Sequence, residues 1–463
     1  MSSAATERAE APGRSRRTPS PPGPRGHALL GVLPEIRSDP LNFFLRAARD
    51  YGDIVALDLP FQRVFLVAHP EYVRHVLQDN YRNYGKGRLA GKMRFALGDG
   101  LLTSEGEGWQ RQRQLLQPAF QRAHIAALDS PIAAAVEGLI ASWSDVAARG
   151  DPIDVARDMS RLTLDIFLRA MFGTSASDKA AAVYRAVTFL HQHANRKMWA
   201  LVDLPEWIPT PRNRRVKRAL AELDGIIYRI IEAQRRGEEA PDNLLSRMIA
   251  ALSNGSDRLL RDEAVTMLVA GHETTACALT WIWYLLSKHP QVERRLLLEV
   301  ASVLGRRSPT SDDLPRLAYT KMVVQECLRL LPAVWWFART CLAEDEIGGY
   351  SIPKGAVILL CQYVTNRHPG FWDNPEGFDP ERFSPERSGE RPHFAFFPFG
   401  GGPRICIGNH FAMMEMMMAV PMILQRFRLS LVPGHPIAFE PLVALRAKHG
   451  VLMSVARRSP ASG

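Results

Sequence analysis

Residues 399–408 read FGGGPRICIG, and this stretch around one cysteine decides the fold. Its three successive glycines permit positive φ angles and let the backbone approach a flat ligand closely. Phe399 can lie against the edge of such a ligand, and Arg404 can bind a carboxylate through charge-assisted hydrogen bonds. Gly408 lets a helix begin directly after Cys406, and the positive N-terminal end of that helix favours a thiolate. The stretch therefore predicts a thiolate beside a flat ligand.

Other cysteine and glycine motifs have different spacings. A phosphate loop needs Gly-x-x-x-x-Gly-Lys-Ser/Thr and a dinucleotide loop needs Gly-x-Gly-x-x-Gly, and residues 399–408 contain neither. On the residues alone, a buried cysteine in a glycine turn stays open as the alternative. The other four cysteines are far apart and form no Cys-x-x-Cys pair, so neither a disulfide framework nor a structural zinc site is predicted. They are Cys277, Cys327, Cys341 and Cys361.

The cysteine stretch resembles the signature of the cytochrome P450 family, Phe-x-x-Gly-x-Arg-x-Cys-x-Gly, at every defined position. The matching residues are Phe399, Gly402, Arg404, Cys406 and Gly408. The resemblance implies haem b as the cofactor, with Cys406 as the axial ligand of its iron and Phe399, Arg404 and Gly408 beside the haem. It also implies a monooxygenase that inserts one atom of O2 into an apolar small molecule, by hydroxylation or epoxidation. An axial thiolate suits this chemistry because it pushes electron density onto iron and favours O–O cleavage.

A second motif, AGHETT over residues 270–275, lies midway along an apolar helix predicted over 263–287. Thr266, Ala270 and Thr274 share one face of that helix because they are spaced by four. Small side chains leave room on this face. The His-Glu pair within the motif does not begin a His-Glu-x-x-His zinc site, because position 276 is alanine.

Gly271 is the unusual residue of this motif, because a glycine inside a helix costs about 1 kcal/mol relative to alanine. Close approach of a ligand is one reason to keep it there. The resemblance implies that Ala270 and Gly271 lie at the haem and that Glu273 and Thr274 relay protons during oxygen activation. Taken alone, Thr274 is better explained as a threonine bonded back to the carbonyl group four residues earlier.

Glu326 and Arg329 lie three apart on a helix predicted over 319–331, so they share a face and can pair. The resemblance adds Arg382, within the sequence PERF, as the third member of a buried ion triad. We assign this triad to bracing the haem-binding core and retaining the cofactor rather than to chemistry.

The two propionates of a haem require basic or indole donors from separate segments. The candidates are Trp109, Arg113, Arg339 and Arg404. Trp109 and Arg113 lie four apart at the start of a predicted helix. The alternatives are that Trp109 is an ordinary core residue and that the arginines lie on solvated faces.

The order of the remaining patterns predicts a mainly helical fold with a minor β-sheet region. Alternating residues at 53–59 and 63–67 predict two strands, and strand signals return only near 349–360 and after residue 426. Helical patterns cover 40–49, 70–77, 109–116, 131–148, 155–171, 181–193, 216–236, 263–287, 319–331 and 409–427. We expect a flexible, basic, proline-rich tail over residues 1–27 and a single haem domain over residues 28–463.

Composition limits the class of protein. The chain is 46% hydrophobic and 23% charged with a formal net charge of +10, which is typical of a soluble globular protein with a basic surface. The longest apolar windows, 264–286 and 411–424, contain charged residues, so no membrane span is predicted. The chain shows no secretory signal, which favours the cytoplasm. Its basic residues are scattered among acidic ones without a nucleic-acid motif, so no nucleic-acid partner is predicted.

The expected partners are O2, an apolar substrate and a separate electron donor. No flavin or iron–sulfur segment is visible, so a ferredoxin or flavoprotein is expected to supply electrons, and an acidic donor suits a basic surface. The alternatives are a peroxide-driven peroxygenase, an oxygen-independent isomerase, and a haem sensor or carrier without turnover.

Overall fold

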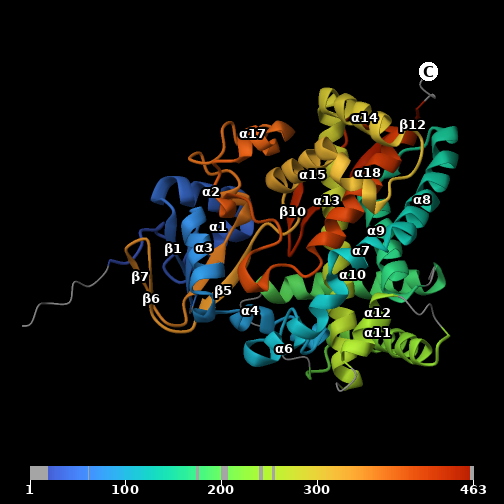
Figure 1. Cartoon of the computed structure of the whole chain (residues 1–463). Coiled ribbons are helices and arrows are strands. Elements are labelled where there is room, and N and C mark those ends of the chain that lie inside the picture. Colours follow the sequence, from blue (N-terminus) through green and yellow to red (C-terminus); the bar gives the residue numbers. More distant parts are fainter. Residues whose placement is uncertain are drawn as a thin grey trace, which may run out of the picture.

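The structure, a computed structural model, describes residues 19–60, 62–173, 177–199, 207–238, 243–252 and 256–458. Figure 1 shows a mainly helical molecule in which strands such as β1 and β5 gather at the side nearest the N-terminus. Long helices form the other side. The expected class, mainly helical with a minor β-sheet region, is confirmed.

The largest sheet has five strands in the order β1-β2-β8-β5-β3. The strands are β1 (Ile54–Leu59), β2 (Gln62–Val67), β8 (Val357–Leu360), β5 (Phe337–Cys341) and β3 (Tyr84–Gly85). Both faces of this sheet are buried. Val64 and Leu66 of β2 join the main core, whereas Phe65 and Val67 join a smaller core on the other face. This alternation is the period of two that a strand imposes on its side chains.

Three smaller sheets complete the β structure. One contains β4 (Ile153–Asp154), β12 (Leu452–Arg457) and β9 (Phe427–Leu431), and the other two are the hairpins β6 (Asp345–Ile347) with β7 (Tyr350–Ile352) and β10 (Phe439–Pro441) with β11 (Leu445–Ala447). The predicted strands at 53–59 and 63–67 are confirmed as β1 and β2. Strand β5 has no counterpart in the sequence-based prediction.

Eleven α-helices among the described residues have eight or more residues. They are α2 (Pro40–Tyr51), α6 (Gly106–Leu116), α8 (Asp129–Arg149), α9 (Val155–Phe172), α10 (Ser177–Trp199), α11 (Pro211–Arg235), α12 (Leu244–Ala251), α13 (Asp257–Lys288), α14 (Pro290–Leu304), α15 (Ala318–Leu330) and α18 (Asn409–Arg426). Shorter helices are α1 (Leu33–Ser38), α3 (Pro70–Arg74), α4 (Gly87–Gly91), α5 (Arg94–Leu97), α7 (Arg122–Ala126), α16 (Gln362–Thr365) and α17 (Pro385–Ser388). Single turns include η1 (His75–Asp79), η5 (Pro380–Phe383) and η7 (Gly402–Arg404).

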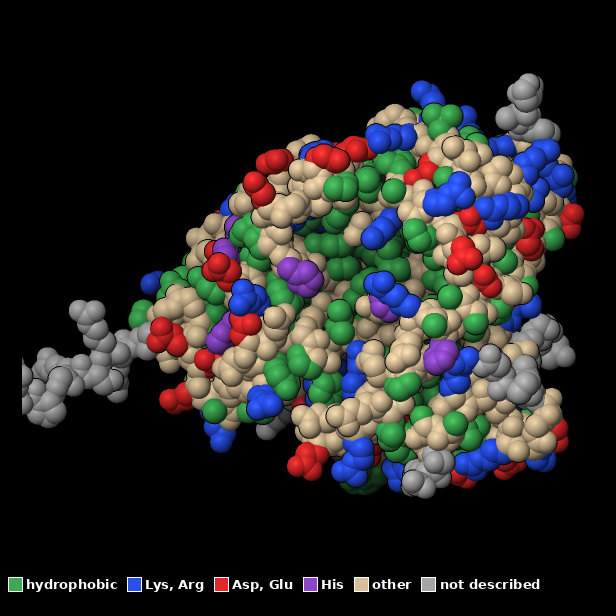
Figure 2. Space-filling model, viewed as in Figure 1, with side chains coloured by type: hydrophobic (Ala, Val, Ile, Leu, Met, Phe, Trp, Pro, Cys, Tyr) green, Lys and Arg blue, Asp and Glu red, His purple; other side chains and the backbone are tan. Residues whose placement is uncertain are grey.

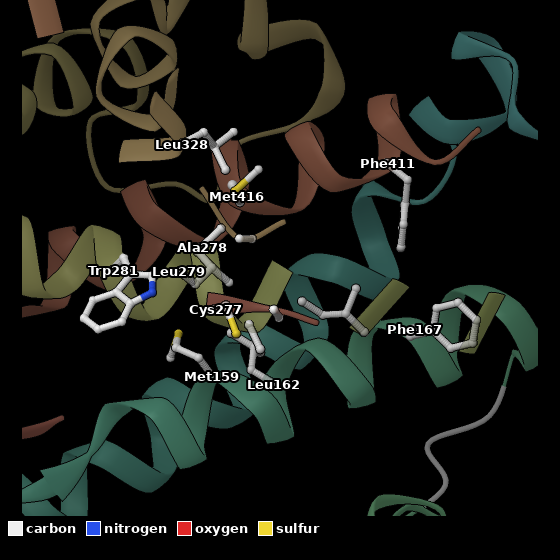
Figure 3. Close-up of a cluster of buried hydrophobic side chains, with 14 of the residues drawn as sticks. Met159, Leu162, Phe167, Cys277, Ala278, Leu279, Trp281, Leu328, Phe411 and Met416 are labelled. Atoms are coloured by element: carbon white, nitrogen blue, oxygen red, sulfur yellow. The ribbon is translucent and has the colours of Figure 1, made fainter. Parts of the chain in front are cut away.

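Helix α13 is the centre of this arrangement. It is apolar on nearly all sides and packs against α9, α15 and α18, as expected for a helix that other helices surround. Figure 3 shows part of this core, where Cys277 and Leu279 of α13 lie among side chains from those three helices. The Ser256 hydroxyl caps the start of α13 by accepting a hydrogen bond from Leu259 N, and the helix ends just before Pro290, which opens α14.

Among the described helices of eight or more residues, α12 and α14 were not predicted from the sequence. Helix α14 has the signal of an amphipathic helix, since Pro290 is at its first position and Val292, Leu296, Val300 and Leu304 are buried at intervals of four. Helix α12 is too short to show a clear periodic pattern, and a capping box between Asn243 and Ser246 stabilises its start.

The expected tail boundary at residue 27 is too late. Pro22 O accepts a hydrogen bond from Ala56 N at 2.8 Å, and Pro19 O accepts one from Ser351 N at 3.2 Å. A Cβ atom on Gly23 would lie 1.8 Å from Ala56 O, so only glycine allows this approach. Residues 19–27 therefore pack against the sheet, and residues 1–18 lie outside the described residues.

One stretch of the described residues, 122–149, is long and apolar enough to cross a membrane by length and composition alone. Most of it is α8, which packs against α9, α18 and β12 and buries Ile132, Val136 and Trp143 in the core. Contacts within the protein therefore account for its apolar side chains.

Residues 98–104 lie directly on α13. Asp99 N donates to Asp262 Oδ2 at 2.9 Å, and Leu101 N donates to Glu263 Oε2 at 3.0 Å. Glu263 is fully buried, and its other oxygen has no hydrogen-bond partner among the described atoms. Burial raises the pKa of Glu263 to about 7, the Leu101 N–H opposes that rise, and the neighbouring Asp262 charge adds to it. The close packing of residues 98–104 thus favours a neutral Glu263.

The substitution Glu263→Gln should increase stability in a pH-dependent way. The Glu263 side chain loses its proton near pH 4.5 in the unfolded protein and near pH 7 in the folded protein. The free energy of unfolding therefore falls as pH rises from about 4.5 to about 7, and this side chain causes no further fall above pH 7. The advantage of the variant should grow to about 1–3 kcal/mol at pH 8.5, after discounting the pKa shift for relaxation. Urea unfolding of the holoprotein at pH 5 and 8.5 measures it. The exposed control Glu107→Gln should show no such growth, and equal behaviour of the two variants would contradict the prediction.

Candidate active site around Cys406

The three glycines of the cysteine loop are required by contacts within the protein. Gly400 and Gly402 have φ angles of +72° and +62°, which side chains rarely allow. A Cβ atom on Gly402 would lie 1.8 Å from Leu77 O in η1, and one on Gly401 would lie 2.2 Å from the ring of Phe394. Close approach to a flat ligand, the reason inferred from sequence, does not explain these two positions. The backbone N–H of Cys406 donates to Phe399 O at 2.9 Å and closes the loop.

Cys406 is accessible but lies in desolvated surroundings. Its side chain is exposed, yet burial of the thiol raises its pKa. The backbone N–H of Gly408, just before α18, and the charges of Arg113 and Lys86 oppose that rise. An accessible sulfur in such surroundings lies in a recess rather than on the outer surface. A Cβ atom on Gly408 would meet nothing within 4 Å, so there is open space beside the sulfur.

Four cations converge on this recess from four segments. Arg113 of α6 donates to Ile405 O at 2.9 Å, Arg404 of η7 donates to Ser104 O at 3.2 Å, and Lys86 donates to Leu102 O at 2.8 Å. Arg404 also lies over the Trp109 ring at 4.1 Å from its centroid. Arg339 of β5 lies nearby, because its charge is felt by Lys86 and Arg404. The candidate donors Trp109, Arg113, Arg339 and Arg404 are thus brought together.

These cations lack a matching number of acids. Burial lowers the pKa of Arg339 to about 10, and repulsion from Arg404 adds to this effect. Burial also holds the pKa of Lys86 well below its usual value. Glu105 is the one carboxylate with an opposing effect on Lys86, Arg339 and Arg404 among the described residues. A group with two carboxylates, such as haem, fits this excess of positive charge.

Lys86 was not among the site residues predicted from the sequence. A lysine in a polar stretch carries no signal of burial. The structure places Lys86 between Leu102 O and the arginines.

The AGHETT motif divides between different sides of α13. Ala270 is exposed although residues 260–269 before it are all buried, so a recess opens beside it. Thr274 Oγ1 donates to Ala270 O at 2.9 Å, which is the back-bonded arrangement considered from the sequence. A Cβ atom on Gly271 would lie 3.1 Å from the Phe167 ring of α9. The packing of α9 therefore gives a reason for glycine at position 271 besides the close approach of a ligand.

Glu273 lies about 100° around α13 from Thr274 and therefore meets different neighbours. Its carboxylate lies 3.5 Å from Arg446 of β11, and both groups are partly buried. Glu273 also lines a cleft of about 1040 Å³ between α9, α10, α13 and the β10–β11 hairpin. Of the two residues expected to relay protons, Glu273 thus lies at this cleft and Thr274 lies beside Ala270.

The Glu326, Arg329 and Arg382 side chains form a buried ion triad. Arg329 and Glu326 make a bidentate pair with N–O distances of 2.7 and 2.8 Å, and Arg382 Nε lies 3.3 Å from Glu326 Oε1. Arg329 also donates to the carbonyl groups of Asn366, Pro375 and Gly377. The triad therefore fixes the chain between β8 and η5, ahead of the cysteine loop.

Comparisons with known proteins agree with this geometry. The family model described as Cytochrome P450 matches residues 21–452. The chain is 38% identical over 430 residues to cyclooctatin synthase of Streptomyces melanosporofaciens, with 91% of both chains covered. It is 31% identical to pentalenene oxygenase of Streptomyces avermitilis, with 93% of this chain and 96% of that relative covered. The crystal structure of the cytochrome P450DA haem domain superposes with a TM-score of 0.87 at 28% identity, over 96% of this chain and 99% of that one.

Removing the buried carboxylate of the triad should destabilise the fold strongly. In Glu326→Gln, two arginines remain buried without a counter-charge, which typically costs about 3–5 kcal/mol. Urea unfolding monitored by circular dichroism measures the loss. The control Asp151→Asn breaks an ion pair with Arg149 whose side chains are 60% and 58% exposed, and it should change stability by less than about 0.5 kcal/mol. A loss of that small size for Glu326→Gln would mean that the triad does not brace the core.

Proposed function

As a member of the cytochrome P450 family, the chain is a monooxygenase that uses haem b, and we propose that Cys406 is the thiolate that binds the haem iron. The support is the accessible sulfur in a desolvated recess, with the Gly408 N–H and two cations directed at it. When bound, haem supplies the oxygen chemistry, because a thiolate ligand favours O–O cleavage.

We assign the propionates to the four cations of the recess. Arg113, Arg339, Arg404 and Lys86 approach from separate segments, and Glu105 is the described carboxylate whose charge acts on the last three. Three of these side chains, Arg113, Arg404 and Lys86, also donate to the backbone carbonyl groups of Ile405, Ser104 and Leu102. Phe399 packs at the edge of the core beside the loop.

Proton supply is assigned to Glu273 and Thr274. Glu273 is adjacent to the cleft and can take up a proton there, while Arg446 at 3.5 Å holds its carboxylate in place. Thr274 can accept a proton at Oγ1 and pass its own onward, because its hydroxyl already donates to Ala270 O and retains free lone pairs. The two residues are consecutive, so a proton taken up on one side of α13 is released on another.

The substrate class is inferred from relatives. One relative is named cyclooctat-9-en-7-ol 5-monooxygenase, from Streptomyces melanosporofaciens, at 36% identity, and pentalenene oxygenase is another. We propose an apolar terpenoid substrate for this chain. Family members require O2 and a source of electrons, and we propose a separate ferredoxin or flavoprotein donor for a cytoplasmic protein. The formal net charge of +10 suits an acidic donor.

Carbon monoxide tests the iron ligand. The reduced wild-type holoprotein should give the red-shifted Soret absorption of a thiolate-ligated haem, and Cys406→Ala should lose it. The control Cys361→Ala removes a fully buried thiol from another segment and should keep the absorption. Retention of the red-shifted band by Cys406→Ala would overturn the assignment.

Product yield per electron tests the function and the proton supply together. With a ferredoxin, its reductase and NADPH, the wild-type protein should oxygenate neutral terpenoids. Glu273→Gln should slow turnover by about 10²-fold and release more peroxide per NADPH, because a general acid is lost. The control Glu440→Gln changes another acid of the same cleft and should leave the yield unchanged. Unaltered yield for Glu273→Gln would contradict the proton-supply role, and equal turnover with peroxide alone would indicate a peroxygenase.

A further inference from the structure

We call the cleft that contains Glu273 the α13 cleft. Its volume of about 1040 Å³ is at the upper end of ordinary ligand sites. Figure 2 shows a hollow near the centre of one face, with apolar side chains in its depth and basic side chains around it. That part of the view corresponds to α13 and β10 in Figure 1, both of which contribute to the α13 cleft. The space is large enough for a molecule of terpenoid size.

The charges of the α13 cleft do not balance. Five basic and three acidic residues line it, so it has a formal excess of two positive charges. One of the acids, Asp154, already accepts hydrogen bonds from Ala156 N and Val451 N at 3.1 Å each. A second, Glu273, pairs with Arg446. The acids of the cleft are therefore largely committed to contacts within the protein.

Two basic side chains of the α13 cleft are available for a ligand. Arg196 of α10 and Lys448, which follows β11, are both exposed, and neither has an ion pair with a described carboxylate. They belong to different elements that border the same cavity. Two cations on separate elements can bind one acidic group between them.

The floor of the α13 cleft is apolar. Ala276 and Cys277 contribute from α13, and Leu442 contributes from the β10–β11 turn. Trp281 also borders the cleft, and its indole N–H is already used by Leu445 O at 2.8 Å, so its contact with a ligand is through carbon. An apolar floor below basic side chains is complementary to an amphiphile.

We infer that the α13 cleft binds a terpenoid with an acidic group, whose apolar body lies on α13 and whose carboxylate or phosphate meets Arg196 and Lys448. This inference rests on the proposed function for the terpenoid body and adds a second binding site, because the residues lining the α13 cleft include neither Ala270 nor Cys406. Arg446 also borders the cleft and links the two roles, because an acidic group bound there competes with Glu273 for the same guanidinium. The acid group of the ligand thus lies next to the residue assigned to proton supply.

Calorimetric titration of the holoprotein with three probes of one carbon skeleton tests the inference. The probes are geranylgeraniol, geranylgeranoic acid and geranylgeranyl phosphate. We expect the acid and the phosphate to bind at least tenfold more tightly than the alcohol at low salt, and the ratio to fall as salt screens the charges. The ratio between acid and phosphate identifies which acidic group is preferred.

The double variant Arg196→Gln, Lys448→Gln should bring the acidic probes to within about threefold of the alcohol and leave the affinity for the alcohol unchanged. Arg446 stays intact, so Glu273 keeps its partner. The control Lys354→Gln removes an exposed lysine outside the α13 cleft and should keep the full ratio.

Equal affinities of the wild-type protein for the three probes would overturn the inference. It would also be overturned if the double variant kept the preference, or lost affinity for all three probes alike. None of these results touches the proposed function, which is judged by oxygenation of neutral terpenoids with an electron supply. Failure of that reaction with an intact preference for acids would instead contradict the proposed function.

Discussion

A buried carboxylate between two arginines is the constraint on which the geometry of the site depends. Glu326, Arg329 and Arg382 are almost completely buried, so each charge has lost its hydration and must be compensated by neighbours. Glu326 pairs with both arginines, and Asp379 N donates to it at 2.9 Å. The remaining donors of Arg329 and Arg382 are used by backbone carbonyl groups between residues 366 and 377. A region with little regular structure is thereby fixed, and the cysteine loop follows it.

The recess beside Cys406 has the opposite property, since its charges are poorly compensated within the chain. Burial lowers the pKa of Lys86, Arg113, Arg339 and Arg404, and Glu105 is the described carboxylate whose charge acts on Lys86, Arg339 and Arg404. A fold that holds four cations close together is less stable without an anionic group. Binding of a dianionic cofactor therefore adds to folding stability by mass action. The triad secures the loop in the protein alone, whereas the cation cluster makes the recess dependent on its cofactor.

The sequence was sufficient to predict a part of the site where the local pattern and the chemistry of the residues agree. The cysteine loop, the helix around Ala270 and the Glu326–Arg329 pair all have short-range signals, and the structure brings their partners together. The reasons behind single residues were less accessible, because they depend on contacts distant in sequence. Gly271 and Gly402 make room for Phe167 and for Leu77 O, which no local pattern reveals. Contacts with residues distant in sequence determine the positions of Lys86 and strand β5. Helix α12 is too short for a periodic pattern of hydrophobic residues.

The proton-supply role that we propose for Glu273 puts helix α13 between the proton source and the substrate. An apolar substrate needs a dry site, since water there would compete for the reacting oxygen. Protons must nevertheless come from water. Helix α13 meets both needs, because consecutive residues point about 100° apart around a helix, so Glu273 can face the α13 cleft while Thr274 faces Ala270. The hydroxyl of Thr274 then provides a single exchangeable proton on the face of α13 that carries Ala270. The charge of Glu273 stays beside Arg446 at the α13 cleft.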